Sequence, residues 1–346
     1  MTQYGEYTRQ EILSQPEAWA EALEHIRAET DNLIRFYRNG QYEQVIFTGC
    51  GSTYYLSIAA AALFQEFGVA ETRALPASEI WMYPRSAYAH NRRTLLIPVS
   101  RSGETTETLR AVESFLARKQ GDVFTISCYG ENPLASMGTA NLVLSSGQEN
   151  SIAQTRAFTV LYLAVTAVAA LWSGQTHQLE AMQSLSQVGR RLLNRFSQVA
   201  QNIGEDTDLE QFYFLGSGAR YGLAAELSLK MKEMSLSVSE PFHFFEFRHG
   251  PQSMVTDKTL IVGLVSDANR AAELQVLNEM RQRGALVLTI GEDSTDVVFE
   301  SGISEDLRGA LYLPIGQLMA FERAIKRNLN PDTPRHLAAV VRLDGQ

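Results

Sequence analysis

The stretch VIFTGCGSTYYL, residues 45–56, decides the fold class of this chain. An apolar run of the kind that forms a buried strand stops at two glycines, and a serine–threonine pair follows them. Three interpretations of such a turn are open: it holds a dinucleotide, it holds a phosphate, or it only ends a strand. The dinucleotide pattern G-x-G-x-x-G is incomplete because Tyr54 stands at the third glycine, so this interpretation is the weakest of the three.

Further short apolar runs lie on both sides of the chain's midpoint, and longer amphipathic segments separate them. In the first half they are QVIFTGCG, TLLIPVSRSG, DVFTISCYG and NLVLSSG; in the second half they are QFYFLGSG, TLIVGLVSD, ALVLTIGED and ALYLPIG. Alternation of this kind is typical of parallel sheets that are covered by helices on both faces. We therefore predict an α/β fold in which these runs are the strands.

The two series of runs are copies of one another. Aligning them places Gly49 on Gly216 and Gly51 on Gly218 at a nearly constant offset, which indicates an internal duplication. We expect an N-terminal helical segment over 1–40, a first α/β domain over 41–174, a helical linker over 175–204, a second α/β domain over 205–330 and a tail over 331–346.

Composition and charge narrow the possible partners. The formal net charge is -9, which argues against binding to nucleic acid or to an anionic membrane, since both attract basic proteins. The most apolar stretch, 157–172, is shorter than the roughly 20 residues that span a bilayer and is typical of a buried helix. The first residues lack the apolar core of a signal peptide, and Cys50 and Cys128 fit a reducing compartment, so we expect a cytoplasmic protein.

The two halves differ in the segment that follows a matching strand. SRSGETTET, residues 100–108, stands in the first half where the second half has SDANRAAEL. Short hydroxyls and backbone N–H groups at the start of a helix suit a phosphate monoester. Because ligands of open α/β sheets bind beyond the carboxyl ends of strands, we predict a phosphate cradle made of Ser52, Thr53, Ser100, Ser102 and Thr105. The alternative is that these side chains only cap helices.

The segment AAELSLKMKEMS, residues 224–235, carries the charges of the second half. Glu226, Lys230 and Glu233 share one face of a helix, which on a protein surface would be a ladder of salt bridges. The neighbouring residues are apolar nearly all round, so we predict a buried helix, and buried ionisable groups often mark a functional site. Glu246 and His249 follow among phenylalanines, and we expect Glu233 or His249 to be catalytic.

Five motifs together resemble those of the sugar isomerase (SIS) domain proteins: GCGSTYY, SRSGETTET, AQTRAFT, ELSLKMKE and EFRHGP. The chain is most similar to the isomerase half of the glutamine–fructose-6-phosphate aminotransferases and to stand-alone aminosugar-phosphate isomerases and deaminases. This resemblance covers nearly the whole chain. It implies two tandem flavodoxin-like SIS domains of three αβα layers, in a homodimer whose active site lies at the subunit interface.

The resemblance also implies a role for each matched residue. The first domain would hold the phosphate of a sugar phosphate through Ser52, Thr53, Ser100, Arg101, Ser102 and Thr105. Glu233 would move a proton between the two carbons flanking the carbonyl, Lys230 would stabilise the enediolate, and His249 would serve ring opening. Further candidate substrate contacts are Gly51, Glu226 and Glu246. No cofactor is implied, and the sequence has no metal-ligand spacing.

Three departures from the family's pattern narrow the function. The printed sequence begins without a glutaminase domain, so we expect no glutamine-dependent synthesis by this chain alone. Ala339 in TPRHLAAVV stands where the synthases have a lysine that forms a Schiff base, which argues against amination. Arg101 replaces a glutamine of the synthases and adds a guanidinium group at the expected phosphate site.

These residues suit proton abstraction next to a carbonyl or imine. The leading hypothesis is an aldose–ketose isomerase that also deaminates a hexosamine 6-phosphate or a fructosamine 6-phosphate through an enediol(amine). The nearest alternative is a sugar-phosphate isomerase that does not deaminate. An alternative from another class is a non-catalytic sugar-phosphate sensor, against which the intact KMKE and RHGP motifs argue.

Overall fold

The computed structural model describes residues 4–88 and 92–343. The first three residues of the expected N-terminal segment and the last three of the expected tail lie outside this range. The chain forms two compact units. One unit, which we name the first repeat, contains residues 17–148, 156–183 and 338–346; the other, the second repeat, contains residues 1–16, 149–155 and 184–337.

The first repeat is built on a sheet of five parallel strands in the order β2-β1-β3-β4-β5. The strands are β1 (Gln44–Gly49), β2 (Glu71–Pro76), β3 (Thr94–Ser100), β4 (Gly121–Ser127) and β5 (Ala140–Val143). The helices of this part of the chain are α2 (Gln15–Ala28), α3 (Thr30–Gly40), α4 (Ser52–Glu66), α5 (Ala77–Met82), α6 (Pro84–Ala87), α7 (Thr106–Leu116), α8 (Pro133–Met137), α9 (Arg156–Trp172) and α10 (Gln178–Met182), with a 3₁₀ turn, η1 (Ser145–Gly147).

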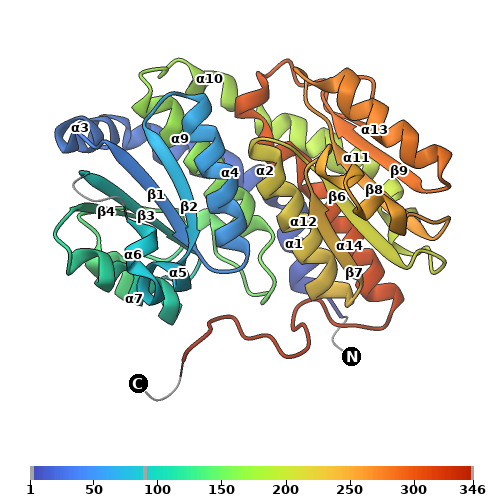
Figure 1. Ribbon diagram of the computed structural model, residues 1–346, viewed down its shortest axis with the longest axis horizontal. Helices are drawn as coiled ribbons and strands as arrows, with labels where there is room; N and C mark the ends of the chain where they lie inside the picture. The colour runs from blue at the N-terminus through green and yellow to red at the C-terminus, as the bar shows by residue number, and fades with distance from the viewer. Residues whose placement is uncertain (1–3, 89–91, 344–346) are drawn as a thin grey trace. The chain divides into compact units, whose positions relative to one another are not determined.

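Successive strand residues face the two helix layers in turn, because side chains alternate along a strand. Ile46 belongs to the core beneath α5 and α7, together with Phe115, whereas Phe47 packs edge-on against Phe64 of α4. Figure 1 shows α5–α7 on one side of this sheet and α4 and α9 on the other. Every residue of α9 from Ala157 to Trp172 is buried, which confirms the buried helix predicted from the apolar run.

The second repeat has the same construction, with strand order β10-β9-β8-β6-β7. Its strands are β6 (Gln211–Leu215), β7 (Val238–Phe242), β8 (Thr259–Leu264), β9 (Leu286–Gly291) and β10 (Val297–Val298). Its helices are α1 (Glu6–Leu13), α11 (Leu185–Gly204), α12 (Ala219–Ser235), α13 (Arg270–Gln282) and α14 (Pro314–Lys326), and its 3₁₀ turns are η2 (Glu246–Arg248), η3 (Pro251–Met254), η4 (Glu305–Leu307) and η5 (Gly309–Tyr312).

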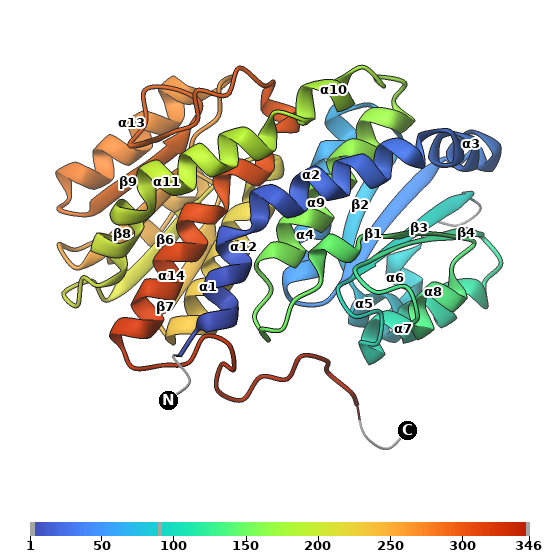
Figure 2. The same ribbon diagram turned by 180° about the vertical axis from the view of Figure 1, so that it is seen from behind.

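Helices cover both faces of this second sheet. Figure 2 shows α11 and α14 side by side over one face, and α13 packs on the other, where Val276 and Leu277 contact the core around Ile261. The segment expected to be a helical linker therefore contributes α11 to the layers of the second repeat.

The duplication predicted from the sequence is confirmed by the backbone. The strand orders match when the first sheet is read from β2, the edge strand after α4, and the second from β7, the edge strand after α12. In both repeats a glycine with a left-handed φ precedes that helix: Gly51 has φ 55° and ψ -124°, and Gly218 has φ 58° and ψ -138°. Only glycine adopts this region readily, so these two glycines are needed to pass from strand to helix.

One strand prediction is wrong. The run ALYLPIG, 310–316, forms the turn η5 and the start of α14 rather than a strand. Pro314 occupies the first turn of α14, where its fixed φ and missing N–H are tolerated. These residues are all buried, and a fully buried apolar run does not distinguish a strand from a helix.

The strands β2, β7 and β10 were not predicted. All three are edge strands, and β2 (ETRALP) and β7 (VSEPF) include exposed residues. An edge strand is less apolar than a central one, so an apolar run is a weak signal for it.

Candidate functional site

The charged face of α12 is assembled as the sequence predicted. Helix α12 packs against β6, β7 and α14, and this covers its apolar residues on several sides. Glu226 and Lys230 are fully buried, whereas the Glu233 side chain is 20% exposed. The Lys230 ammonium lies 3.3 Å from the Glu226 carboxylate and 2.5 Å from the Glu233 carboxylate. We name these three residues the α12 triad.

The two carboxylates fix the charge of the lysine. Burial by itself lowers the pKa of Lys230, but the negative charges of Glu226 and Glu233 outweigh this effect and raise its pKa above the ordinary value. Lys230 is therefore a cation at neutral pH. A buried cation that lies beside a reacting centre can stabilise negative charge as it develops on a substrate oxygen.

Glu233 also faces a cavity of about 220 Å³. The other lining residues are Tyr4, Met234, Leu236, Asn328, Leu329, Asn330, Thr333, Pro334 and Arg335. Most of them belong to the segment that follows α14, so this segment brings Arg335 to the same cavity as Glu233. The volume is below the roughly 300–1,000 Å³ of typical ligand pockets, and it suits part of a small ligand.

The loop after β7 places Glu246 and His249 on the surface of the second repeat. Both residues are exposed, and Arg248 between them pairs with Glu279 of α13. Across residues 4–88 and 92–343, no hydrogen bond or ion pair joins the His249 side chain to the α12 triad. The folded chain brings Glu226, Lys230 and Glu233 together, and the role of His249 in the site of a partner subunit stays a prediction.

A stacked pair at the carboxyl edge of the second sheet was not found from the sequence. The rings of Tyr221 and His243 are nearly parallel, with centroids 4.0 Å apart. Burial lowers the pKa of His243, although the charge of Glu246 opposes this. His243 directly follows β7, and residues at that edge are candidates for ligand contact. Had β7 been predicted as a strand, the position of His243 directly after it would have marked this residue as a candidate.

In the first repeat, the two predicted phosphate loops follow neighbouring strands, β1 and β3. Four of the predicted residues are almost fully buried there: Ser52, Thr53, Ser100 and Arg101 are each at most 6% exposed. The Sγ atom of Cys50 lies 3.6 Å from the Thr108 hydroxyl, so the turn that contains Gly51 contacts α7. The folded chain thus brings the two loops together.

Several hydroxyl groups in these loops bind the loops themselves. The Thr53 hydroxyl accepts a hydrogen bond from the Cys50 N–H and donates one to the Cys50 carbonyl oxygen, both at 3.0 Å. The Ser100 hydroxyl accepts from the Gly103 N–H at 3.0 Å, and the Ser102 hydroxyl accepts from the Glu104 N–H at 3.2 Å. These bonds fix the shape of the two loops.

Thr105 differs from the other hydroxyl residues. It is the N-cap residue of α7, but its side chain makes no capping hydrogen bond. Helix capping, the alternative considered for these residues, therefore does not account for the Thr105 hydroxyl.

The C-terminal tail lies beside the second of these loops. The Thr106 N–H donates to the Val341 carbonyl oxygen at 3.3 Å, and the Arg342 guanidinium lies 2.5 Å from the Glu104 carboxylate. The tail segment that contains Ala339 therefore runs to the start of α7, within the first repeat.

The described part of the chain contains neither a metal cluster nor a membrane-spanning helix. Within residues 4–88 and 92–343, no group of three or more His, Cys, Asp or Glu side chains is arranged to hold a metal ion. In the same residues, no helix has the length and apolar character needed to cross a membrane. Burial, chiefly, raises the pKa of the Cys50 thiol to about 11, which does not favour a reactive thiolate.

Comparison with known proteins identifies relatives over the full length of this chain. The glutamine–fructose-6-phosphate aminotransferase of Methanothermobacter thermautotrophicus is 26% identical over 360 aligned positions, and that of Pyrococcus horikoshii is 26% identical over 357. Each alignment covers 99% of this chain and 58% of the relative. The chain thus spans little more than half the length of these enzymes.

Solved structures show the same arrangement of strands and helices. The structure of glucosamine-6-phosphate deaminase from Thermotoga maritima matches with a TM-score of 0.81 and 27% identity, covering 97% of this chain and 99% of that one. Tagatose-6-phosphate ketose/aldose isomerase from Escherichia coli matches in fold, with a TM-score of 0.86 and 24% identity over 95% of each chain. A family model described as SIS domain matches residues 41–171 and 207–300. The two repeats are therefore SIS domains, and the chain belongs to the SIS domain family.

Proposed function

We propose that this protein is an isomerase and deaminase of aminosugar phosphates, acting on a hexosamine 6-phosphate or a fructosamine 6-phosphate through an enediol(amine) intermediate. The observation that carries the proposal is the α12 triad, in which a buried lysine pairs with a carboxylate that faces a cavity. Proton transfer between adjacent carbons requires a positioned base and a positive charge near the oxygen or nitrogen that becomes electron-rich. Glu233 and Lys230 supply these two groups.

In a 2-amino aldose phosphate, Glu233 removes the proton from the carbon that carries the amino group. The electron pair moves toward the carbonyl oxygen, and the Lys230 ammonium stabilises the charge that develops there. The protonated Glu233 then returns the proton to the neighbouring carbon as the nitrogen lone pair forms a carbon–nitrogen double bond. A proton passes from this nitrogen to the former carbonyl oxygen, which leaves a hydroxyl group there and an imine at the carbon that held the amino group. Water adds to this imine, the carbon–nitrogen bond breaks, and a ketose phosphate and ammonia are released.

Glu226 is assigned to the support of Lys230 rather than to the chemistry. Its carboxylate is fully buried and lies 3.3 Å from the ammonium. It keeps the lysine charged and limits its side chain to one position. The reaction then does not have to include the entropy cost of positioning this side chain.

We assign the phosphate group to the cradle of the first repeat. The hydroxyl and backbone groups of its two loops, the adjacent start of α7 and the buried guanidinium of Arg101 match the chemistry of a phosphate dianion. Thr105 is a ligand in this proposal, because its hydroxyl lies at the start of α7 and makes no capping hydrogen bond there.

One of the similar solved structures supports the deamination part of the proposal. It is a glucosamine-6-phosphate deaminase at 27% identity, and its alignment leaves almost no part of either chain unmatched. Ala339 cannot form an imine, so the chain lacks at that position the amine by which the family's synthases hold a ketose. We also propose a cytoplasmic homodimer, in which the exposed His249 of one subunit serves ring opening in the site of its partner.

The test is an assay of the purified protein with hexosamine 6-phosphates and fructosamine 6-phosphates. We expect release of ammonia together with a sugar phosphate in equal amounts. Interconversion of aldose and ketose phosphates without ammonia would replace the proposal with plain isomerisation. Thermal stabilisation by a sugar phosphate without turnover would indicate a sensor; a ligand at 100 times its dissociation constant adds about 2.7 kcal/mol of stability. A protein that shows none of these responses contradicts the proposal.

A further inference from the structure

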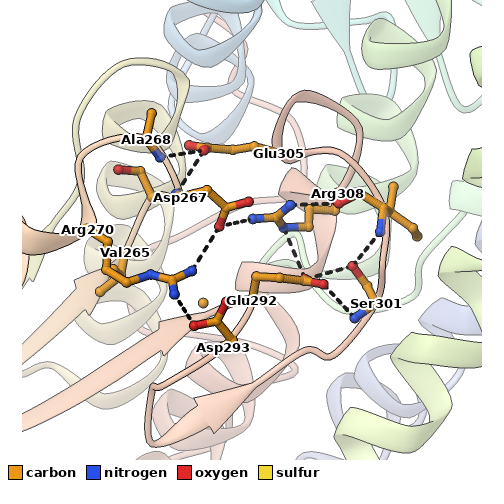
Figure 3. A network of polar contacts seen from close by, with 12 residues as sticks. Val265, Asp267, Ala268, Arg270, Glu292, Asp293, Ser301, Glu305 and Arg308 are labelled. Atoms are coloured by element: carbon orange, nitrogen blue, oxygen red, sulfur yellow. Dashed lines mark hydrogen bonds and ion pairs between the residues drawn. The ribbon is translucent and has the colours of Figure 1, made fainter.

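The second repeat holds a carboxylate at the place where a ligand of this fold would bind. In Figure 3, Glu305 points to the loop after β8. Its carboxylate accepts hydrogen bonds from the backbone N–H groups of Asp267 at 2.8 Å and Ala268 at 3.3 Å. The other carboxylate oxygen pairs with the Arg220 guanidinium. An anion is therefore bound by two backbone donors and a cation at the carboxyl edge of the second sheet.

The donors of this site correspond to the phosphate cradle of the first repeat. The Ser266 hydroxyl accepts from the Asn269 N–H at 3.0 Å, which is the bond that the Ser100 hydroxyl makes with Gly103 in the first repeat. The matched hydrogen bond aligns the two loops, so that Asp267 and Ala268 stand where Arg101 and Ser102 stand in the first repeat. The matched glycines before α4 and α12 likewise place Arg220 at the position of Thr53.

We infer that the second repeat is an oxyanion cradle closed by its own Glu305, whose carboxylate occupies the position that a phosphate or carboxylate ligand would take. The closure confines oxyanion binding of this kind to the first repeat. The inference concerns the second repeat alone and holds whether or not the chain has the activity proposed above.

The segment that carries Glu305 is fixed in place by a network of ion pairs, drawn in Figure 3. Arg308, which is 1% exposed, lies 2.5 Å from the Asp267 carboxylate and 3.4 Å from the Glu292 carboxylate. Glu292 in turn accepts from the Ser301 hydroxyl at 2.7 Å. Residues on both sides of Glu305 are held in this way. Binding of its carboxylate to the two N–H groups therefore costs little additional conformational entropy.

The local charges exclude a second anion while Glu305 is present. The Arg220 guanidinium lies between Glu305 and the buried Glu273, whose carboxylate is 4.0 Å away. One cation already faces two carboxylates, so a phosphate entering the cradle would meet repulsion rather than a free positive charge. Removal of the Glu305 carboxylate leaves Arg220 and two N–H donors for one exogenous oxyanion, and a single carboxylate such as formate is the closest replacement.

The test compares Glu305→Ala with the wild-type protein in sodium chloride, sodium formate and sodium phosphate at equal ionic strength. We expect formate to raise the thermal unfolding midpoint of Glu305→Ala by several degrees more than that of the wild type, and phosphate to do the same if the cradle also admits a dianion. Glu210→Ala removes an exposed carboxylate of the same repeat, which pairs with Lys258, and it should respond as the wild type does. The double variant Glu305→Ala with Arg220→Ala should lose the formate response.

Two outcomes overturn the inference. One is an equal response of Glu305→Ala, Glu210→Ala and the wild type to formate. The other is a Glu305→Ala chain that is unfolded in chloride and stays unfolded in both formate and phosphate. Glu305→Gln, which keeps an oxygen acceptor at the two N–H groups, should fold in chloride and respond to formate less than Glu305→Ala does.

Discussion

The ammonium of Lys230 lies 2.5 Å from the carboxylate of Glu233, and this contact joins the core of the second repeat to a cavity. Lys230 is fully buried, whereas Glu233 is partly exposed. In the proposed mechanism the pair couples stability to function: Lys230 neutralises charge inside the protein and at the same time positions the carboxylate that lines the cavity. Substitutions of the two residues should separate these contributions.

Replacement of Glu233 with glutamine should remove the base without removing the binding site. We expect kcat for the proposed reaction to fall by about 10²–10⁴-fold, the usual contribution of a general base, with a small change in substrate affinity. The measurements are steady-state kinetics and calorimetric binding of the substrate. Glu240→Gln, at an exposed position on β7, is the matched control and should keep full activity. An active Glu233→Gln enzyme would remove Glu233 from the mechanism.

Replacement of Lys230 with methionine should mainly destabilise the fold. It leaves the buried Glu226 carboxylate without its cation, and breaking a buried ion pair in this way costs about 3–5 kcal/mol. Urea unfolding measures this loss. The double variant Lys230→Met with Glu226→Gln should recover part of the loss, because the uncompensated charge is gone. The control is Lys232→Met on an exposed part of the same helix; a loss of equal size there would show that the ion pair is not the cause.

Replacement of Thr105 with alanine should weaken substrate binding and leave stability nearly unchanged. Its hydroxyl makes no capping bond, so the change in unfolding free energy should stay within about 0.5 kcal/mol. Loss of one hydrogen bond to a charged phosphate, worth about 1.5–3 kcal/mol, should raise KM about 10- to 100-fold. Ser100→Ala differs, since it also removes the bond to Gly103 and should lower stability. If Thr105→Ala leaves KM unchanged, Thr105 is not a phosphate ligand.

The carboxyl group of Glu11 should make stability depend on pH. Burial, reinforced by the charge of Glu149, raises its pKa above 4.5. The folded state therefore binds this proton more tightly than the unfolded state. The contribution of Glu11 to stability is fully present below pH 4.5 and is lost as pH rises through the raised pKa.

Urea unfolding of the wild type and of Glu11→Gln from about pH 4 to about pH 8, a range that starts below the ordinary pKa of 4.5, measures this effect. The unfolding free energy of the wild type minus that of the variant should decrease as pH rises. A difference that increases with pH would mean that the hydrogen bonds from Asn150 and Ser151 to this carboxylate dominate its pKa. Subtraction of the variant removes the contributions of other buried carboxyl groups.

The sequence by itself determined the features that depend on local spacing. Strand, glycine turn and helix follow one another in GCGSTYY and again in the second half, so the parallel sheets and the duplication were predictable. Helical periodicity was enough to place Glu226, Lys230 and Glu233 on one face, because residues three and four apart on a helix are neighbours wherever the helix lies. The same reasoning predicted the buried helix α9.

Only the tertiary structure decided the features that depend on contacts between distant segments. The run 310–316 is a helix start because it packs inside the second repeat, and the edge strands form because a neighbouring strand offers its hydrogen-bonding groups. Nothing in the sequence places Glu305 on the N–H groups of Asp267, nor Glu233 beside the segment that follows α14. Local spacing fixes which residues share a face, whereas long-range packing fixes what that face meets, and the chemistry of a site depends on both.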